Sequence, residues 1–431
     1  MTKITSFLCS LLAGTFLLSS CDNSDRSSGG TIGGTGSGMI SDLSFCDAKG
    51  MIKPLRQTTI LLDARTLKKG TDAAQFTAAN GTVRDLILSI ADPEKATTSG
   101  TTAYRERVSI AVVPADGSPA VMAFTGCIPG LSPEELQQAR ESTSTASEFF
   151  TGDQATKLEE RKESFRRNLI GGLTAAAAKA DGTTGSEEGP IANSKFFASL
   201  RSSRKIFQSD EYAQRFIIFS DASGLTVDAK PEAKSVAPRE LGIAAGSDAG
   251  GDFGLSEIYL VLPDGKEPTN RDMLEGYFLA QGAWLAAYSS GKVSTVSPAP
   301  IRLWNLVGEV DYPSRKEDIR IRIGDDGTGK LTMSWLTLIG DPVNRSTPMS
   351  GRIDCISPNS CKISSDDGGF AQVWSVALGG DPEFKNDMPF GGMRQFYIEL
   401  ANNKLEGKVF DPSVILSEDG KNFVMIRAAK R

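Results

Sequence analysis

Residues 215–224, RFIIFSDASG, start with a run of apolar side chains and end in a polar segment that begins at Ser220. A short apolar run bounded by small polar residues is typical of a strand that is buried on both faces of a parallel sheet. The polar end of such a strand lies at the carboxyl edge of the sheet, where open α/β sheets bind their ligands. The stretch therefore predicts a buried strand, and it raises the question whether Asp221 holds a metal ion or only ends that strand.

Other strands of the same kind are predicted nearby. Residues 58–66, TTILLDART, form a short apolar run that ends at Asp63, and residues 256–265, SEIYLVLPDG, form another. Residues 107–126, RVSIAVVPADGSPAVMAFTG, indicate two strands joined by a turn that contains Pro and Gly. We expect this hairpin to lie beside the strand that ends at Asp63.

Helical patterns separate these strands. Residues 153–179 carry acidic side chains early and basic ones later, and residues 193–208, NSKFFASLRSSRKIFQ, have a partial apolar face. Residues 224–254 are rich in Gly, Ala and Asp and predict a loop, whereas residues 270–291 predict a helix that covers the sheet with apolar side chains including Trp284. The alternation predicts an α/β domain with a mainly parallel sheet, one antiparallel edge hairpin and helices on both faces.

The order of these elements resembles the von Willebrand factor A-like domain, and the resemblance spans about residues 45–295. In that family the first strand ends in Asp, and a later strand ends in Ser or Thr, Asp and a small residue. A divalent cation, Mg²⁺ or Mn²⁺, is held there by an Asp-x-Ser-x-Ser string, a Thr from a later loop and the second Asp. Asp63 and Asp221 match the two Asp positions, so the resemblance implies that they are candidate metal ligands.

The other ligand positions of this site are not kept. Arg65 and Leu67 occupy the two hydroxyl positions after Asp63, and Thr183 and Thr184 come early in their loop. Divalent cations of this kind prefer oxygen ligands, and Mg²⁺ needs them in octahedral geometry. The guanidinium of Arg65 is able to neutralise Asp63 in place of the metal. The sequence therefore favours a degenerate site with a structural or salt-bridged Asp pair, and metal binding is the alternative.

Residues 300–431 predict a separate all-β domain, a small sandwich or barrel. Apolar and polar side chains alternate in residues 318–339, DIRIRIGDDGTGKLTMSWLTLI, with the period of two that strands require. Residues 324–331, GDDGTGKL, have the spacing of a phosphate-binding loop, but a Leu stands where Ser or Thr would bind Mg²⁺, and no helix follows. We expect a hairpin turn there, with Arg320 and Arg322 on the solvated outer face.

The amino terminus has the features of an export signal. In residues 1–25, MTKITSFLCSLLAGTFLLSSCDNSD, one Lys precedes an apolar stretch over residues 7–18 that is too short to span a bilayer. The string Leu-Ser-Ser-Cys that ends at Cys21 resembles the bacterial lipoprotein box, in which the Cys becomes the lipidated first residue of the mature chain. We expect a signal peptide over residues 1–20 and a lipid on Cys21; an ordinary signal peptide with a stray Cys is the alternative.

The lipid on Cys21 predicts a location in the bacterial cell envelope, with the protein facing the periplasm. Residues 21–44 are rich in Gly and Ser and predict a flexible tether between the anchor and the first domain. By analogy with enteric lipoproteins, Asp22 favours the inner membrane, and the outer membrane is the alternative.

Four further cysteines, an even number, predict disulfides in an exported protein. Residues 355–361, CISPNSC, contain Pro and Asn, which favour a turn that brings Cys355 and Cys361 together. Cys46 and Cys127 would then pair across the first domain and close a long loop, which stabilises the fold by about 4 kcal/mol in the chain-entropy model. Four free thiols are the alternative.

The composition limits the chemistry that the chain can perform. Its 431 residues contain no histidine, which excludes Ser-His and Cys-His nucleophile pairs, histidine bases and histidine-ligated zinc. The 47 basic and 53 acidic residues give a net charge of -6, which predicts no nucleic-acid partner. Any catalysis must therefore rest on carboxylates, Lys, Tyr or Cys.

These observations favour a membrane-anchored lipoprotein that binds another envelope protein. Such a protein would act as a binding or scaffolding module in a secretion, surface-assembly or adhesion system, without catalysis. The alternative is a carboxylate-dependent envelope hydrolase or a glycan-binding protein, in which Trp335 and Trp374 stack on a sugar. Aromatic residues on alternating strands are, however, more typical of a core.

Overall fold

The computed structural model of the chain describes the following residues: 39–43, 45–46, 54–65, 83–95, 101–114, 116–131, 148–182, 196–203, 211–220, 236–249, 253–263, 265, 267–293, 299–311, 316–327, 330–338, 344–357, 360–365, 398–401, 404–410 and 423–430. The predicted signal peptide, Cys21 and Asp22 lie outside the described residues, as do Asp221 and Trp374.

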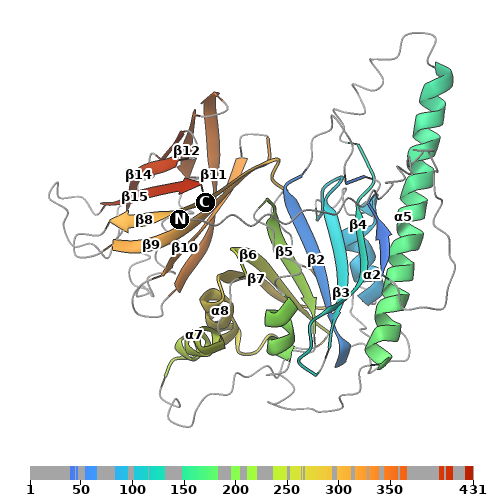
Figure 1. Cartoon of the computed structure of the whole chain (residues 1–431), viewed down its shortest axis with the longest axis horizontal. Coiled ribbons are helices and arrows are strands. Elements are labelled where there is room, and N and C mark those ends of the chain that lie inside the picture. Colours follow the sequence, from blue (N-terminus) through green and yellow to red (C-terminus); the bar gives the residue numbers. More distant parts are fainter. Residues whose placement is uncertain are drawn as a thin grey trace, which may run out of the picture. The chain divides into compact units, whose positions relative to one another are not determined.

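A seven-stranded sheet forms the first part of the chain (Figure 1). Its strands lie in the order β1-β4-β3-β2-β5-β6-β7. Strands β2, β3, β5, β6 and β7 are parallel, whereas β4 is antiparallel to β3 and parallel to β1. The strands are Ile40–Asp42 (β1), Arg56–Asp63 (β2), Arg107–Val113 (β3), Val121–Cys127 (β4), Ala213–Phe219 (β5), Ser256–Leu262 (β6) and Ala283–Ser290 (β7).

The predicted mainly parallel α/β sheet is confirmed, together with the hairpin of β3 and β4, but the hairpin is not the edge of the sheet. Strand β1 pairs with β4 over Phe124, Thr125 and Gly126 and takes the outer position. It comes from residues that the Gly- and Ser-rich composition assigns to the tether. Ile40 is apolar and packs against the core of the sheet, and this contact favours pairing of the short segment with β4.

The central strands are apolar on both faces. In β2, Ile60 and Leu62 enter one core cluster, and Leu61 enters the cluster on the opposite face. In β5, Ile217 and Ile218 divide in the same way. Side chains of successive residues in a strand point to opposite faces, so burial of both faces requires the continuous apolar run that the sequence shows.

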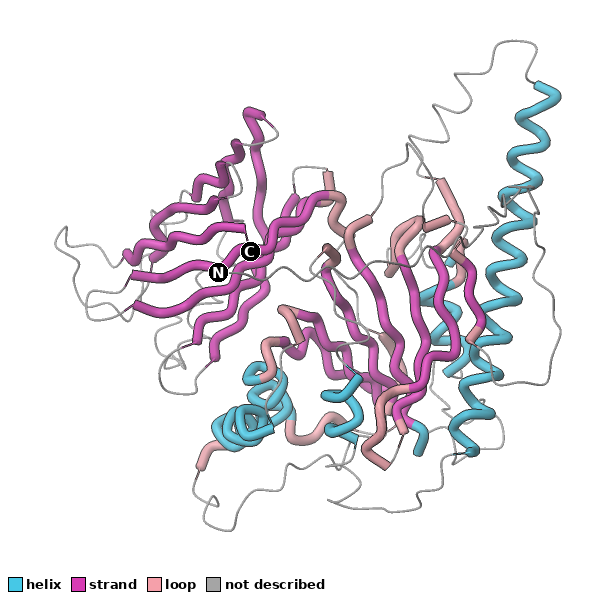
Figure 2. Tube along the Cα trace, in the orientation of Figure 1, coloured by secondary structure: helices cyan, strands magenta, loops and turns pink. Residues whose placement is uncertain are grey.

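Helices cover both faces of the sheet (Figures 1 and 2). One face packs against α2 and α5, and the other packs against α8 and a helical segment over residues 196–203. Helix α7 packs on α8. The labelled helices are Val83–Ala91 (α2), Glu148–Gly182 (α5), Pro238–Ala249 (α7) and Arg271–Ala280 (α8).

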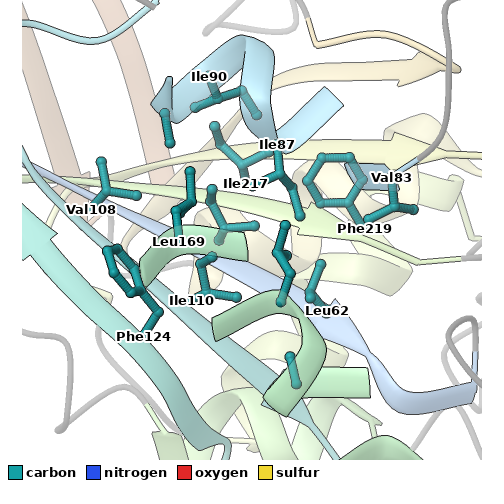
Figure 3. Packing of buried hydrophobic residues seen from close by; sticks show 14 of the residues in the cluster. Leu62, Val83, Ile87, Ile90, Val108, Ile110, Phe124, Leu169, Ile217 and Phe219 are labelled. Carbon is teal, nitrogen blue, oxygen red and sulfur yellow. The ribbon is translucent and has the colours of Figure 1, made fainter. Parts of the chain in front are cut away.

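Figure 3 shows the core under α2 and α5. Helix α2, which the sequence analysis did not predict, buries Val83, Leu86, Ile87 and Ile90. Their spacing of three and four residues places them on one face of the helix. These side chains meet the buried side chains of β2, β3 and β5, so α2 closes this part of the core.

The prediction of one helix over residues 270–291 is wrong in its second half. Helix α8 ends at Ala280, and β7 begins at Ala283 and pairs in parallel with β6. Gly282 has φ 72°, a left-handed conformation that glycine adopts without strain and that commonly ends helices. Trp284 therefore lies on a strand of the sheet and not on a helix above it.

The predicted loop over residues 224–254 contains a helix, α7, which begins at Pro238. Proline is favoured at the first helical position. The side chains of α7 are small, and its core contact is made by Gly242, Ile243 and Gly246. A Cβ atom at Gly242 would lie 1.9 Å from the carbonyl oxygen of Met273 in α8, so the two helix backbones are in direct contact. Such a helix carries no strong apolar pattern, which explains why it was predicted as a loop.

The C-terminal part of the chain consists of eight antiparallel strands that form a closed barrel. Strands β8 to β15 pair in sequence order, and β15 also pairs with β8. The strands are Arg302–Asp311 (β8), Lys316–Asp325 (β9), Lys330–Leu338 (β10), Asn344–Ser357 (β11), Ser360–Ser365 (β12), Ile398–Ala401 (β13), Lys404–Phe410 (β14) and Phe423–Lys430 (β15).

Two predicted turns connect strands of this barrel. The hairpin of β9 and β10 is confirmed, because Asp325 is the register partner of Leu331 and the N–H of Gly327 donates to Oδ1 of Asp325 at 2.9 Å. Cys355 on β11 is the register partner of Cys361 on β12, so the backbone brings the two residues together as predicted. A disulfide between them stays a prediction.

The prediction that Arg322 is solvated is wrong. Arg322 is buried, and its Nε donates to Oδ1 of Asn305 at 2.9 Å. Its Nη1 donates to the carbonyl oxygen of Leu255 at 3.0 Å. The alternation of β9 correctly separates Arg322 from Ile323. A period of two does not, however, tell whether the polar face meets solvent or another part of the chain.

The predicted pairing of Cys46 with Cys127 is confirmed, since the two residues, 81 positions apart in sequence, form a disulfide. Cys127 is the last residue of β4, and Cys46 follows β1 after a short turn. The bond therefore attaches the start of the described chain to the edge of the sheet.

A buried group of charged side chains lies at the amino-terminal ends of β2, β3 and β5. Glu106 accepts hydrogen bonds from Nε and Nη2 of Arg56 at 2.9 and 2.8 Å, and from Nη2 of Arg215 at 3.2 Å. Thr58 donates to Glu106 and accepts from Nε of Arg215 at 2.8 Å. Among the described residues, Nη1 of Arg215 has no hydrogen-bond partner. Glu106 is thus ion-paired with both buried guanidinium groups.

Candidate functional site

The candidate site lies at the carboxyl edge of the sheet, where β2 and β5 end side by side. Leu62 and Phe219 are register partners, and the next residues are Asp63 and Ser220. Both of these side chains are buried, with exposed fractions of 1% and 0%. The parallel arrangement of the two strands therefore brings a carboxylate and a hydroxyl group together at one point of the edge.

The carboxylate of Asp63 is bonded on both oxygens. Oδ1 accepts hydrogen bonds from the backbone N–H and from Nε of Arg65, both at 3.0 Å. Oδ2 accepts from Nη2 of Arg65 at 2.7 Å and from Oγ of Ser220 at 2.6 Å. The predicted neutralisation of Asp63 by Arg65 is thus present as a bidentate ion pair, which is the strong geometry for a guanidinium and a carboxylate.

The guanidinium of Arg65 is held from a second side. Its central carbon lies 5.3 Å from the centre of the Phe196 ring, in a cation–π arrangement. Phe196 is buried and belongs to the helical segment that covers this face of the sheet. The position of Arg65 is therefore fixed by Asp63 and Phe196 together, while 19% of its side chain stays exposed.

Several predicted site residues cannot be placed beside Asp63. Asp221, Leu67, Thr183 and Thr184 lie outside the described residues. Within the part of the chain that the structure describes, no group of three or more His, Cys, Asp or Glu side chains is arranged to hold a metal ion. The described half of the site consists of an acid, a base and a hydroxyl group.

Sequence reasoning found Asp63 and Arg65 but missed two members of the site. Ser220 stands directly before Asp221, and it reaches Asp63 because β5 is the sheet neighbour of β2. Phe196 lies in residues 193–208, for which the sequence predicted a helix with a partial apolar face, and it contacts Arg65 from there. Ser220 could have been placed only from the order of the strands in the sheet. No sequence signal indicated the contact between Phe196 and Arg65.

The arrangement has a direct chemical consequence. Mg²⁺ or Mn²⁺ would have to displace hydrogen-bond donors from at least one oxygen of Asp63 before it could bind there. The charge of Asp63 is already balanced, and its lone pairs already accept hydrogen bonds from the chain itself. Asp63, Arg65 and Ser220 therefore form an internally bonded group in which the charge of Asp63 is balanced.

We expect the free energy of unfolding of an Arg65→Ala variant to be about 1–2 kcal/mol lower than that of the wild type, since Asp63 stays buried and loses its counter-charge. The variant should also gain stability on addition of MgCl₂, because its carboxylate becomes available to a cation. Thermal unfolding of both proteins, in MgCl₂ and in MgCl₂ with a 10-fold excess of EDTA, measures both effects. An equal response of the wild type to Mg²⁺ would contradict the role assigned to Arg65. Arg271→Ala, which removes an exposed pair with Glu275, is the matched control.

The fold places the chain among α/β proteins with a mixed, mainly parallel sheet. No protein-family model matches the chain, and no curated protein matches it. Within the described residues, no helix combines the length and apolar character needed to cross a membrane.

Proposed function

We propose that this chain is a lipid-anchored protein of the bacterial cell envelope that binds another envelope protein at the carboxyl edge of a von Willebrand A-like sheet, without a metal. The bidentate pair of Arg65 with Asp63 carries the proposal. In a site that uses a cation to attract its partner, this carboxylate would have to be available. Here an internal cation occupies it.

Two sequence features support the anchor and the location. The string that ends at Cys21 resembles a lipoprotein box, and the Gly- and Ser-rich residues that follow are suited to a tether. A protein held in this way faces the periplasm and meets its partners close to the membrane. The strand order, with β2 and β5 at the centre and β4 antiparallel to β3, supports the von Willebrand A-like class.

A binding role accounts for the described site better than a catalytic one. General acid or base chemistry needs a carboxylate that can exchange a proton with a substrate. Asp63 is buried; its Oδ1 accepts hydrogen bonds from Arg65, and its Oδ2 accepts from Arg65 and Ser220. The alternative hydrolase would require a different pair of acids, about 5 to 10 Å apart in a cleft.

The test is affinity capture of the tagged full-length protein from its native membranes after brief cross-linking. Wild type, Arg65→Ala and Arg271→Ala are compared at equal abundance, each with Mg²⁺ or with EDTA. Captured proteins are identified by mass spectrometry. We expect a specific partner that is retained in EDTA, weakened at least about 10-fold by Arg65→Ala, and unchanged by Arg271→Ala, because loss of one anchoring Arg at an interface costs more than about 1.4 kcal/mol.

Two results would count against the proposal. A partner that is lost in EDTA would mean that a metal mediates binding. A partner that binds both variants equally would move the binding surface away from this edge, with the C-terminal barrel as the next place to search. Circular dichroism of the purified variants shows whether Arg65→Ala is folded and so whether its loss of binding is local.

A further inference from the structure

Strand β1 and the disulfide that follows it form one unit at the edge of the sheet. Ile40, Ser41 and Asp42 pair in parallel with the last part of β4. The chain then turns, with the N–H of Cys46 donating to the carbonyl oxygen of Leu43 at 3.0 Å. The disulfide to Cys127 closes directly beyond the last paired residues. The bond therefore sits where it can hold β1 in place.

The contacts of β1 itself are limited in extent. Ile40 is partly buried against the core. A Cβ atom added at Gly171 in α5 would lie 3.0 Å from Cδ1 of Ile40. Asp42 accepts a hydrogen bond from Nδ2 of Asn168 at 3.1 Å. The flanking Met39 and Leu43 are 52% and 45% exposed. A strand of three residues at an edge, with one apolar side chain in the core, gains little from packing.

The disulfide shortens the loop that must close when β1 pairs. Without it, thirteen residues separate Asp42 from Arg56, the start of β2. With it, three residues separate Asp42 from Cys46, which is joined to the end of β4. The entropic cost of closing a loop rises with its length, so the shorter loop made by the disulfide raises the pairing equilibrium of β1 by about 5- to 10-fold. The covalent bond thus contributes to the docking of β1 directly.

We propose that Cys46 and Cys127 form a redox-controlled clamp, and that reduction of their disulfide by a dithiol releases β1 from β4 while the rest of the sheet stays folded. One thiolate of the reductant attacks the disulfide and forms a mixed disulfide with one Cys, and the other Cys leaves as a thiolate and takes a proton. The second thiol of the reductant then closes its own disulfide and frees the first Cys as a thiol. Two electrons pass from the dithiol to the protein. Cys46 is half-buried and is the accessible partner, whereas Cys127 is 2% exposed.

Release of β1 has two structural effects. The backbone groups of β4 that pair with β1 lose their partners, so the sheet gains an open edge able to accept another strand. Met39, which comes directly before β1, is no longer held beside β4. The clamp is independent of the edge around Asp63, and it does not require the proposed binding partner.

The experiment is hydrogen–deuterium exchange of the full chain, followed by mass spectrometry of peptides that cover β1, β4, β2 and β5. The oxidised protein is compared with protein reduced by dithiothreitol, and with a Cys46→Ser variant that needs no reductant. We expect the amides of β1, and those amides of Phe124–Gly126 that pair with β1, to exchange about 5- to 10-fold faster in both cases, as the loop-length estimate requires. Amides of β2 and β5 should keep their protection.

Two further variants give the matched controls. Cys355→Ser with Cys361→Ser removes the other predicted disulfide and should leave exchange in β1 unchanged. Asn168→Ala removes the hydrogen bond to Asp42 and should accelerate exchange in β1 even in the oxidised protein. Unchanged exchange of β1 on reduction would overturn the clamp, because β1 would then be held by its own contacts. Loss of protection throughout the sheet would also overturn it, because the disulfide would then be needed for the whole fold.

Discussion

A Glu106→Gln variant should lose about 3–5 kcal/mol of its free energy of unfolding, the usual cost of breaking a buried ion pair by removing one partner. Glu106 is fully buried and is the acceptor for both Arg56 and Arg215. The amide keeps the shape of the side chain but removes the negative charge and one acceptor oxygen. Two guanidinium groups then stay buried without their shared counter-charge. Urea unfolding at pH 7, followed by circular dichroism, measures the change.

Arg215→Met is the matched variant, and its expected loss is smaller, about 1 kcal/mol or less, because Glu106 keeps a one-to-one pair with Arg56. Burial, and next the charge of Arg56, lower the pKa of Arg215 to about 10 against the opposing effect of Glu106. Its charged form is thus costly to bury, and Nη1 remains without a partner among the described residues. Equal losses for the two variants would contradict a network centred on Glu106.

The same group predicts how stability depends on acid. Burial alone would raise the pKa of Glu106, but the charges of Arg56 and Arg215 and the hydrogen bonds of Arg56 and Thr58 outweigh it and hold the pKa below its ordinary value of 4.5. A lowered pKa in the folded state contributes stability above the unfolded pKa, and this contribution is lost as the pH falls below about 4.5. Urea midpoints between pH 7 and pH 3 should fall more steeply for the wild type than for Glu106→Gln. Parallel curves would show that Glu106 is not the source of the loss of stability in acid.

Gly242→Ala is the second variant with a large expected effect. In an exposed helix this change stabilises by about 1 kcal/mol, because alanine loses less conformational entropy than glycine. Here the new Cβ would lie 1.9 Å from the carbonyl oxygen of Met273 and 2.9 Å from the nitrogen of Tyr277. Both contacts are with backbone, so no side chain can rotate away. We expect a loss of about 3 kcal/mol, the upper range for overpacking, as α7 moves away from α8.

Ser247→Ala on the exposed side of α7 is the control for helix propensity, and its stability should change by less than about 0.5 kcal/mol. Thermal unfolding of both variants, with proteolysis to locate the loosened segment, separates the two effects. Stabilisation by Gly242→Ala would show that α7 and α8 are not in backbone contact.

The sequence predicted the parts of the fold that depend on continuous apolar runs. Strands β2, β5 and β6 and the hairpin of β3 and β4 were predicted because both faces of these strands are buried. Helix α7 was missed because its packing depends on Gly242 and Gly246, and a face made of glycine has no apolar pattern. Strand β7 was merged with α8 because its apolar residues continue those of the helix, and the boundary is marked by the left-handed backbone of Gly282.

The candidate site was predicted in part for a related reason. Asp63 and Arg65 are two residues apart in sequence, so their pairing could be anticipated from local spacing and charge. Ser220 is 157 positions from Asp63, and only the order of the strands brings it there. Arg322 shows the same limit, because its partner Leu255 comes from another part of the chain.

The glycine contacts between α7 and α8 also set a limit on how this protein can diverge during evolution. A Cβ atom added at Gly242, Gly246 or Gly276 would lie within 2.5 Å of a backbone atom of the opposite helix. Exposed positions of α7 such as Ala244 and Asp248 have no such restriction. Distant relatives should therefore keep these three glycines while the rest of both helices changes. Their spacing, together with the strand-end Asp63, offers a pattern for finding relatives that overall sequence similarity does not reveal.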